Sequence, residues 1–515
     1  MLPDGDEPGR LAEDAAGRVH VVLRRGGAIV SIDAASGTVI ARRTVCGAAR
    51  GVAYQKATDQ VHVACAGGEL VSLPAAGGAP VRTIMLDRDL RDVVVAANGS
   101  LLVTTFRKAE VLVIGADGRL TSRLPPGSGA VPTMRGTVEM RTPAVAWRMA
   151  ALDDSRGSVV ILHQTGVTDL VDPAPGGYAG AKNCGAIVQP GLSVLTPGTS
   201  SPPVATGLGG LTLAIDVAVS PDHQKVALAV AGNSGGQEPT IVEESLQAAS
   251  PPTPIACGGD HNHVVRPPPG QVVAVSYAQT GVLFAQTREP AALWRSDTGA
   301  TTSLASDSRA DTGQLIFHVN AGGGLACASC HPEGGEDGRV WNFVCMGARR
   351  TQSLRGGVSE TTPFHWDGGE SDLSALLDDV FSGRMAGPLL TDDQKSALRA
   401  WVDTIPAMPI VAGLDRSAVA RGGALFQDPK LACATCHAGV LLTNNETLEV
   451  GTGRPLQVPS LRGLSWRAPF MHDGCAATLA GRFSSTSCGG GDKHGATSAL
   501  TAAQIGDLIA YLESF

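Results

Sequence analysis

A five-residue motif occurs twice in the C-terminal part of the chain, as CASCH at residues 327–331 and as CATCH at residues 433–437. This Cys-x-x-Cys-His pattern is the attachment signature of c-type heme. Both thiols add to the heme vinyl groups, and the adjacent His supplies the proximal nitrogen to the iron. A structural zinc site or a dithiol redox pair would explain a single copy, but two copies with matching flanks favour heme. We therefore predict two covalent hemes, held by Cys327, Cys330, His331, Cys433, Cys436 and His437.

The length and composition limit the class of protein. A chain of 515 residues is too long for one hydrophobic core, so two or three domains are expected. No apolar run approaches the length needed for a transmembrane helix, so no transmembrane segment is predicted. The net charge of −8 gives no electrostatic reason to expect nucleic acid as a partner.

Cysteine usage indicates the compartment. Of the eleven cysteines, four belong to the heme motifs and seven remain. Bacterial heme attachment at this motif takes place outside the cytoplasm, so we expect a periplasmic or extracellular protein in which disulfides can form. No leader is visible in residues 1–20, so we expect that it was cleaved or left out. The expected pairs, with buried free thiols as the alternative, are Cys46–Cys65, Cys184–Cys257 and Cys475–Cys488, leaving Cys345 unpaired.

Residues 15–305 read as short strands separated by Gly, Asp, Asn and Ser turns. The repeated pattern of strand, tight turn, strand and polar turn resembles the degenerate repeats of bacterial β-propellers. At roughly 40–45 residues per blade, this stretch predicts a propeller of six or seven blades over residues 1–305. A pair of β-sandwiches is the competing fold, and Pro173–Pro203 is expected to be a long loop or insertion. Representative strands are Val19–Leu23, Ala28–Ile32, Val61–Ala66, Leu101–Thr105, Val111–Ile114, Val159–Leu162, Val226–Val230 and Val272–Tyr277.

After about residue 306 the apolar residues recur at helical spacing, and Thr391 and Thr501 stand where helix N-caps belong. Landmarks before and after the two heme motifs match in the same order, including SLRG and a segment containing PF and DG. This duplication predicts two mostly α-helical cytochrome c lobes, at residues 306–412 and 413–515. The expected helices are Leu373–Val380, Asp392–Thr404, Ser417–Phe426 and Ala502–Leu512.

These landmarks over residues 306–515 resemble the bacterial diheme cytochrome c peroxidase and MauG family, most specifically in the stretch from Val458 to Leu479. The resemblance implies that Trp366 lies between the hemes. It also implies a Ca²⁺ ion between the lobes, held partly by the main-chain carbonyls of Arg467 and Pro469. The asparagine that helps to hold this ion in the family would fall near Thr351, where this chain has none. Trp366 and His472 are the candidate catalytic residues.

Two departures from that family matter for function. The peroxidatic heme of the family needs a glutamate after the WDG segment, and residues 380–388 contain none. The family's methionine ligand after the HDG segment is absent around Thr486. These departures favour electron transfer over peroxide cleavage.

The distal iron ligands are expected in the loop before the last helix of each lobe. Met385 and His494 occupy equivalent places there, and Met and His are the usual sixth ligands. We predict His331 with Met385 at the first iron and His437 with His494 at the second, forming a high–low potential couple. Met385 could instead pack in the core and His494 could be solvated, with His472 the runner-up for the second iron.

The sequence therefore predicts a multidomain, exported diheme cytochrome that relays electrons to or from a redox partner protein, with the propeller as docking or scaffold domain. The alternative is an oxidoreductase using hydrogen peroxide, either a cytochrome c peroxidase or a MauG-like oxidase. A propeller module with hemes as redox sensors is the third candidate. The coordination of the iron distinguishes the electron-transfer protein from the peroxide-using enzyme, because peroxide chemistry needs an iron with a vacant or labile position.

Overall fold

The computed structural model describes residues 5–132, 138–180, 185–199, 205–234, 238–246, 263–264, 270–485 and 488–515. The chain divides into two compact units. The first contains residues 1–168, 180–310 and 324–326, and the second contains 169–179, 311–323 and 327–515. Within the described ranges, no helix combines the length and the apolar character that a membrane crossing requires.

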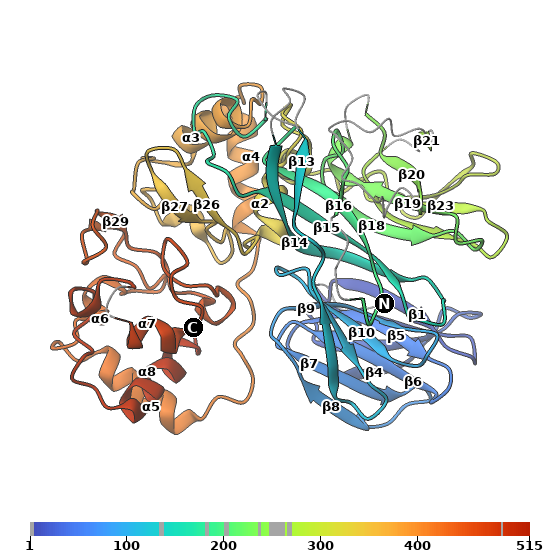
Figure 1. The fold of residues 1–515 in the computed structure, drawn as a ribbon, viewed down its shortest axis with the longest axis horizontal. Coiled ribbons are helices and arrows are strands. Elements are labelled where there is room, and N and C mark those ends of the chain that lie inside the picture. The colour runs from blue at the N-terminus through green and yellow to red at the C-terminus, as the bar shows by residue number, and fades with distance from the viewer. Residues whose placement is uncertain are drawn as a thin grey trace. The chain divides into compact units, whose positions relative to one another are not determined.

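The first unit consists of successive antiparallel sheets, each with its strands in chain order (Figure 1). Their strands are β1 (Pro8–Glu13), β2 (Arg18–Leu23), β3 (Ala28–Asp33) and β4 (Val39–Thr44); β5 (Ala49–Gln55), β6 (Gln60–Cys65), β7 (Glu69–Pro74) and β8 (Arg82–Met85); β9 (Leu90–Val95), β10 (Leu101–Thr105), β11 (Val111–Ile114) and β12 (Leu120–Leu124); β13 (Gly129–Pro132), β14 (Val138–Ala151), β15 (Val159–Val167), β16 (Val188–Leu195) and β17 (Thr206–Gly207); β18 (Ala214–Val219), β19 (Lys225–Val230), β20 (Ile241–Ser245) and β21 (His263–Val264); and β22 (Val272–Tyr277), β23 (Leu283–Thr287), β24 (Ala292–Arg295) and β25 (Thr301–Ser303).

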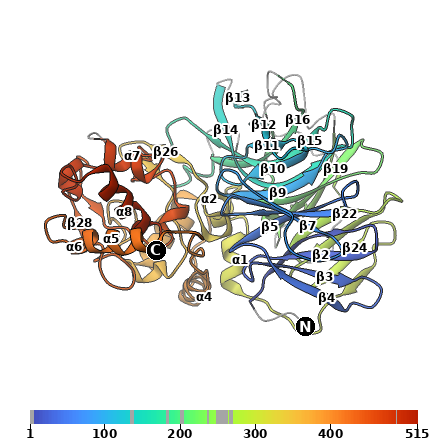
Figure 2. The ribbon, with the colours of Figure 1, turned by 90° about the horizontal axis from the view of Figure 1, so that it is seen from below.

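These six sheets are the blades of a six-bladed β-propeller, so the propeller prediction is confirmed and the β-sandwich alternative is wrong. Neighbouring blades pack through their inner strands, where β1 contacts β5, β5 contacts β9, β9 contacts β14, β14 contacts β18 and β18 contacts β22 (Figure 2). Apolar side chains of adjacent blades form the core, as Val52, Val63 and Val71 do with Val22 and Ile29. Each blade therefore buries its faces against its neighbours.

A chain of ion pairs joins the inner strands of the propeller. Asp216 on β18 accepts from Arg10 on β1 at 2.9 Å and lies 3.4 Å from Arg148 on β14, which also pairs with Asp92 on β9 at 3.1 Å. Asp216 also accepts the main-chain N–H of Val275 on β22 at 3.0 Å. The network connects charged groups from blades far apart in sequence, which spacing along the chain could not reveal.

Buried His–Ser pairs recur at equivalent places in three blades. His20 bonds to Ser31 at 2.9 Å, His62 to Ser72 at 2.9 Å and His163 to Ser193 at 3.0 Å. All three imidazoles are fully buried, and burial lowers the pKa of His62 to about 4. Asp14 completes an Asp–His–Ser set in the first blade. Its residue types match a hydrolase triad, but Ser31 is buried, so the set is structural.

Ser72→Ala is expected to lower the free energy of unfolding by about 1–3 kcal/mol, because it removes one of the two hydrogen-bond partners of the buried His62 ring, leaving Gln55 as the other. Urea denaturation followed by circular dichroism measures the change. Ser155→Ala, at an exposed turn, is the matched control and should change stability by less than about 0.5 kcal/mol. Equal stability of the two variants would show that the buried pair contributes nothing.

The second unit is mixed, with short helices and two small hairpins. Its elements are α1 (Thr312–His318), α2 (Cys327–Cys330), η2 (Pro332–Gly334), β26 (Val340–Phe343), β27 (Gly347–Arg350), η3 (Val358–Glu360), α3 (Leu373–Leu376), η4 (Leu377–Arg384), α4 (Asp392–Asp403), α5 (Arg416–Phe426), α6 (Cys433–Cys436), β28 (Thr447–Leu448), β29 (Leu456–Gln457), η5 (Leu464–Trp466), α7 (Leu479–Ser484), η6 (Gly491–His494) and α8 (Ala502–Leu512). Among its described residues, the first unit has one short 3-10 helix, η1 (Ala231–Asn233).

The duplication is visible in this unit. Helix α1 packs against α4, and α5 packs against α8. Both crossings are close at a glycine: a Cβ on Gly313 would lie 2.2 Å from the Ala397 carbonyl oxygen, and one on Gly422 would lie 1.9 Å from that of Asp507. The predicted N-caps Thr391 and Thr501 each form a capping box. That the two repeats are cytochrome c lobes divided at residue 412 stays a prediction.

Candidate heme sites of the second unit

The second Cys-x-x-Cys-His motif forms helix α6 and the residue after it. Burial raises the pKa values of the Cys433 and Cys436 thiols. His437 is half-buried, desolvation lowers the pKa of its ring, and its Nδ1 lies 3.2 Å from the Leu442 carbonyl oxygen. Nε2 is therefore the ring nitrogen left for a ligand, and the carbonyl sets the orientation of the ring.

The structure brings His494 opposite His437. Their ring centroids are 6.2 Å apart, and the ring planes make an angle of 38°. His494 Nδ1 lies 3.1 Å from the Gly489 carbonyl oxygen, so each ring has Nδ1 tied to the main chain. Burial, with smaller effects of Arg482 and His437, lowers the pKa of His494 to about 4, which keeps the imidazole neutral as a metal ligand requires.

The spacing of these rings fits one metal ion between them. With a metal–nitrogen bond of about 2.0 Å and about 1.1 Å from nitrogen to ring centroid, two imidazoles on opposite sides of one ion have centroids about 6.2 Å apart. The observed separation is 6.2 Å. The residues at the second motif therefore fit a bis-histidine heme.

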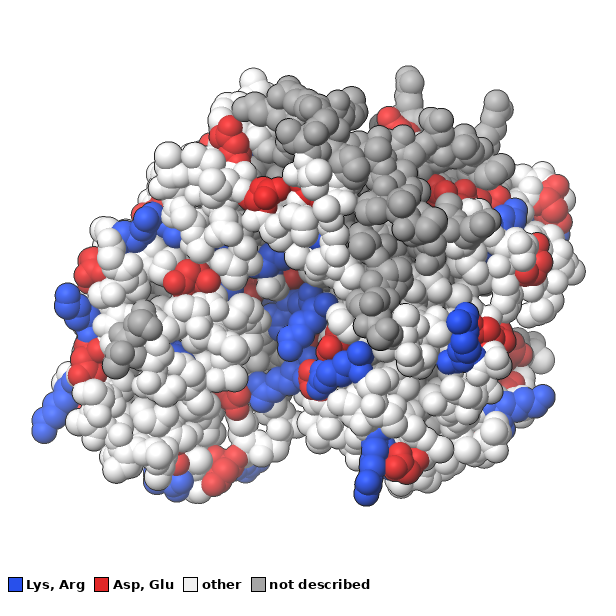
Figure 3. All heavy atoms as spheres, viewed as in Figure 1, with Lys and Arg blue, Asp and Glu red and all other residues white. Residues whose placement is uncertain are grey.

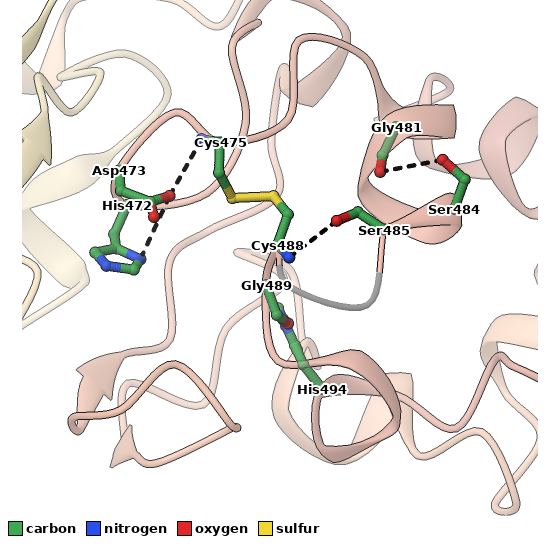
Figure 4. The surroundings of a disulfide bond; sticks show 9 residues. All are labelled: His472, Asp473, Cys475, Gly481, Ser484, Ser485, Cys488, Gly489 and His494. Carbon is green, nitrogen blue, oxygen red and sulfur yellow. Dashed lines mark hydrogen bonds and ion pairs between the residues drawn. A yellow bond between two sulfur atoms is a disulfide. The ribbon is translucent and has the colours of Figure 1, made fainter.

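A disulfide stands next to this pair. Cys475 and Cys488 are bonded, and Cys488 directly precedes Gly489, whose carbonyl holds His494 (Figure 4). The predicted Cys475–Cys488 bond is confirmed, as is Cys46–Cys65 in the propeller. The predicted Cys184–Cys257 bond lies outside the described residues. Cys345 is exposed and free, as predicted.

The first motif is more deeply buried. Burial raises the pKa of Cys327 to about 12 and that of Cys330 further, and it lowers the pKa of His331. Met385 is only 4% exposed and stands at the end of η4, where its N–H donates to the Val380 carbonyl at 2.9 Å. The described contacts thus bring the rings of His437 and His494 close together, but hold Met385 in place through its main chain.

A segment from between β15 and β16 belongs to the second unit. Its residue Tyr178 donates its N–H to the Arg384 carbonyl at 2.9 Å, and Arg384 Nη1 donates to the Tyr178 phenol oxygen at 3.2 Å. Cys330 acts electrostatically on Tyr178, although burial is the main cause of its raised pKa. The loop or insertion expected over Pro173–Pro203 was wrong for Val188–Leu195, which form β16. The sequence also did not place residues 169–179 beside the first motif, because no local pattern encodes so distant a contact.

The candidate catalytic residues Trp366 and His472 lie together, with ring centroids 6.3 Å apart. Trp366 Nε1 donates to the Arg350 carbonyl at 2.7 Å, and the Arg350 N–H donates to the His472 carbonyl at 2.6 Å. Burial lowers the pKa of His472. Its ring packs against Trp366, whereas His437 faces His494, so His472 is the weaker candidate for the second iron.

The residues expected to hold calcium do not fit that ion. The Arg467 carbonyl accepts a hydrogen bond from the Arg350 guanidinium, which also pairs with Glu336 at 2.9 Å. Thr351 accepts from the Trp341 indole at 3.2 Å. A guanidinium already supplies the positive charge at this carbonyl, so we assign no calcium there.

Comparison with known proteins corrects the resemblance derived from short motifs. No protein-family model matches the chain. Among curated proteins, the chain is similar to hydrazine synthase subunit gamma of Kuenenia stuttgartiensis. The two are 27% identical over 258 residues, which cover 37% of this chain and 72% of the relative. The resemblance to diheme peroxidases and MauG was therefore wrong.

Solved structures give matches of low overall similarity. Two are of Kuenenia stuttgartiensis hydrazine synthase: one pressurised with xenon (TM-score 0.35, 23% identity, 39% of this chain and 86% of that chain), and one with TM-score 0.38, 10% identity, 60% of this chain and 98% of that chain. The WD40 repeats of RRP9 match with TM-score 0.36 and 12% identity, over 54% of this chain and 72% of that chain.

Proposed function

We propose that this chain is an exported diheme c-type cytochrome that transfers electrons as a subunit of a multi-subunit redox enzyme related to hydrazine synthase. The observation that carries the proposal is the opposed pair His437 and His494, with ring centroids 6.2 Å apart beside a Cys-x-x-Cys-His motif. The similarity to hydrazine synthase subunit gamma, which is named as a subunit, supports a place for this chain in a multi-subunit assembly. The two cytochrome lobes, at 306–412 and 413–515, are part of the proposal, as is a redox partner protein.

The residues have distinct roles in this proposal. Bound heme supplies one-electron iron chemistry. Cys327, Cys330, Cys433 and Cys436 anchor the two groups, and His331 and His437 are the proximal ligands. Met385 and His494 close the distal sides. A thioether raises the potential of its iron relative to a second imidazole, so the two sites are expected to differ in potential.

Trp366 and His472 have a positioning role in the same proposal. Their rings lie edge to face between segments that belong to the two repeats, and main-chain bonds through Arg350 fix both. The propeller is proposed as the docking or scaffold domain. Figure 3 shows acidic side chains interspersed with basic ones on the face drawn, in line with the small net charge of −8.

Mass spectrometry of the mature protein tests the covalent hemes. Expression with a c-type maturation system is expected to add two heme masses, and the variant Cys433→Ser/Cys436→Ser is expected to carry one fewer. Ser485→Ala, outside both motifs, should retain both. A mature wild-type chain without any heme adduct would refute the proposal.

Met385→Ala is expected to convert the first heme to high spin and to lower its reduction potential, because the thioether ligand is lost. Low-temperature electron paramagnetic resonance (EPR) of the oxidised protein and a redox titration measure both effects. Met408→Ala, a half-buried methionine without an assigned role, should leave the spectrum unchanged. An unchanged spectrum for Met385→Ala would remove Met385 as a ligand.

A further inference from the structure

Three metal-ligating side chains converge in the second unit outside the proposed heme ligands. His365, Glu370 and Asp379 each offer one ligand atom, and these atoms lie within 4.8 Å of one another. All three residues are half-buried. They come from separate places in the chain: His365 and Glu370 flank the WDGG turn, and Asp379 lies on η4. The turn brings His365 and Glu370 together locally, and the fold adds Asp379.

Two of these groups are available for a ligand. The side chains of His365 and Glu370 have no hydrogen bond or ion pair with any other residue in the described part of the chain. Burial, with Asp379 as the next cause, raises the pKa of Glu370, and the positive charge of Arg384 offsets this only in part, so further positive charge would stabilise the carboxylate. A cation beside the two carboxylates would supply that charge.

Asp379 is held in place from outside the cluster. Arg384 Nη2 lies 2.6 Å from Asp379 Oδ2, and the same guanidinium donates to the Tyr178 phenol oxygen. Carboxylates that bind metals are commonly oriented by such outer partners. A carboxylate has enough lone pairs to accept both the guanidinium and a metal ion. With two carboxylates and one guanidinium, the cluster keeps a net negative charge.

We infer that His365, Glu370 and Asp379 form a binding site for a divalent transition-metal cation such as Mn²⁺, Fe²⁺ or Zn²⁺. One imidazole nitrogen and two carboxylate oxygens suit these ions better than Ca²⁺ or Mg²⁺, which prefer oxygen ligands alone. Two atoms bound tetrahedrally at about 2.1 Å lie about 3.4 Å apart, so binding draws the groups together by at most about 1.4 Å. Rotation about side-chain bonds covers that distance.

Three protein ligands leave coordination positions open, which is typical of catalytic rather than structural metal sites. His331 acts electrostatically on His365, so the cluster lies in the same region as the first heme motif. The site goes beyond the proposed electron-transfer function, because its ligands come from outside both heme motifs. Metal binding can therefore be measured independently of heme chemistry.

The test is a Mn²⁺ titration of the full-length, heme-loaded protein, followed by EPR of free Mn²⁺, with Zn²⁺ calorimetry as a second probe. Glu370→Gln, which keeps size and shape, and His365→Ala are each expected to weaken Mn²⁺ binding at least about 10-fold. Asp378→Asn is the matched control, because this exposed neighbour of Asp379 pairs with Lys395 at 2.7 Å, outside the cluster. It should keep wild-type affinity.

The proposal fails if the wild type and Glu370→Gln bind Mn²⁺ equally, whatever the fate of the His365 variant. It also fails if His365→Ala leaves Mn²⁺ affinity unchanged but converts a low-spin ferric heme to high spin, since His365 would then be an iron ligand. Both heme adducts in the mass spectrum with no Mn²⁺ binding would overturn this site while leaving the proposed function intact.

Discussion

In the proposed diheme protein, His494→Ala is expected to convert the second heme completely from six-coordinate low spin to five-coordinate high spin. The physical reason is the proximity of the His437 and His494 rings, whose centroids are 6.2 Å apart, the spacing of two imidazoles on one ion. With His494 removed, no second imidazole remains opposite His437. Absorption and EPR spectra of the ferric protein measure the change, and a redox titration should show a raised potential for this heme.

His472→Ala is the informative comparison for this prediction, because His472 lies in the same half of the unit and is the competing ligand. Its ring packs edge to face on Trp366, 6.3 Å between centroids, so the variant should keep the low-spin signal. The opposite pattern, with His472→Ala producing high spin and His494→Ala silent, would exchange the roles of the two residues.

Much of the fold could be predicted because its strands, tight turns and helix caps depend on residues that are close together in sequence. Alternating strands and tight turns encode a blade, and Gly27 shows why: it has a φ of +61°, and a Cβ there would lie 2.6 Å from the Cys46 carbonyl oxygen. The capping residues Thr391 and Thr501 act within one helical turn, so sequence predicted them as well. The number of blades depends on closure of the ring, and repeat length alone left six and seven open.

The candidate site was less predictable because its decisive contacts are distant in sequence. Duplication suggested His494 and Met385 as equivalents, yet the structure places only His494 directly opposite its partner imidazole. Tyr178 and Arg384 are in contact although 206 positions separate them in sequence, and no periodic pattern of residues predicts this contact. The family resemblance was wrong because short motifs report local turns and cofactor contacts, which proteins of different activity share.

Arg350→Met is expected to lower the free energy of unfolding by about 3–5 kcal/mol, because it leaves a buried carboxylate without its main ionic partner. Arg350 pairs with Glu336 at 2.9 Å, and both side chains are almost fully buried. Arg467 lies 3.9 Å from the same carboxylate and would compensate only in part. The Arg350 guanidinium also donates to the Arg467 carbonyl, so its loss weakens contacts between the two repeats. Urea denaturation followed by circular dichroism measures the effect.

A double-mutant cycle separates the ion pair from simple loss of packing. If the uncompensated charge of Glu336 causes the instability, Arg350→Met/Glu336→Gln should recover most of the stability lost in the single variant. If packing of the long side chain is responsible, the second substitution should give no recovery. Arg454→Met is the matched control, since this exposed arginine, among the residues that the structure describes, donates only to the Met346 carbonyl at 2.9 Å and should change stability by less than about 0.5 kcal/mol. Recovery in the double variant would show that the Arg350 guanidinium stabilises the unit by compensating the buried Glu336 carboxylate.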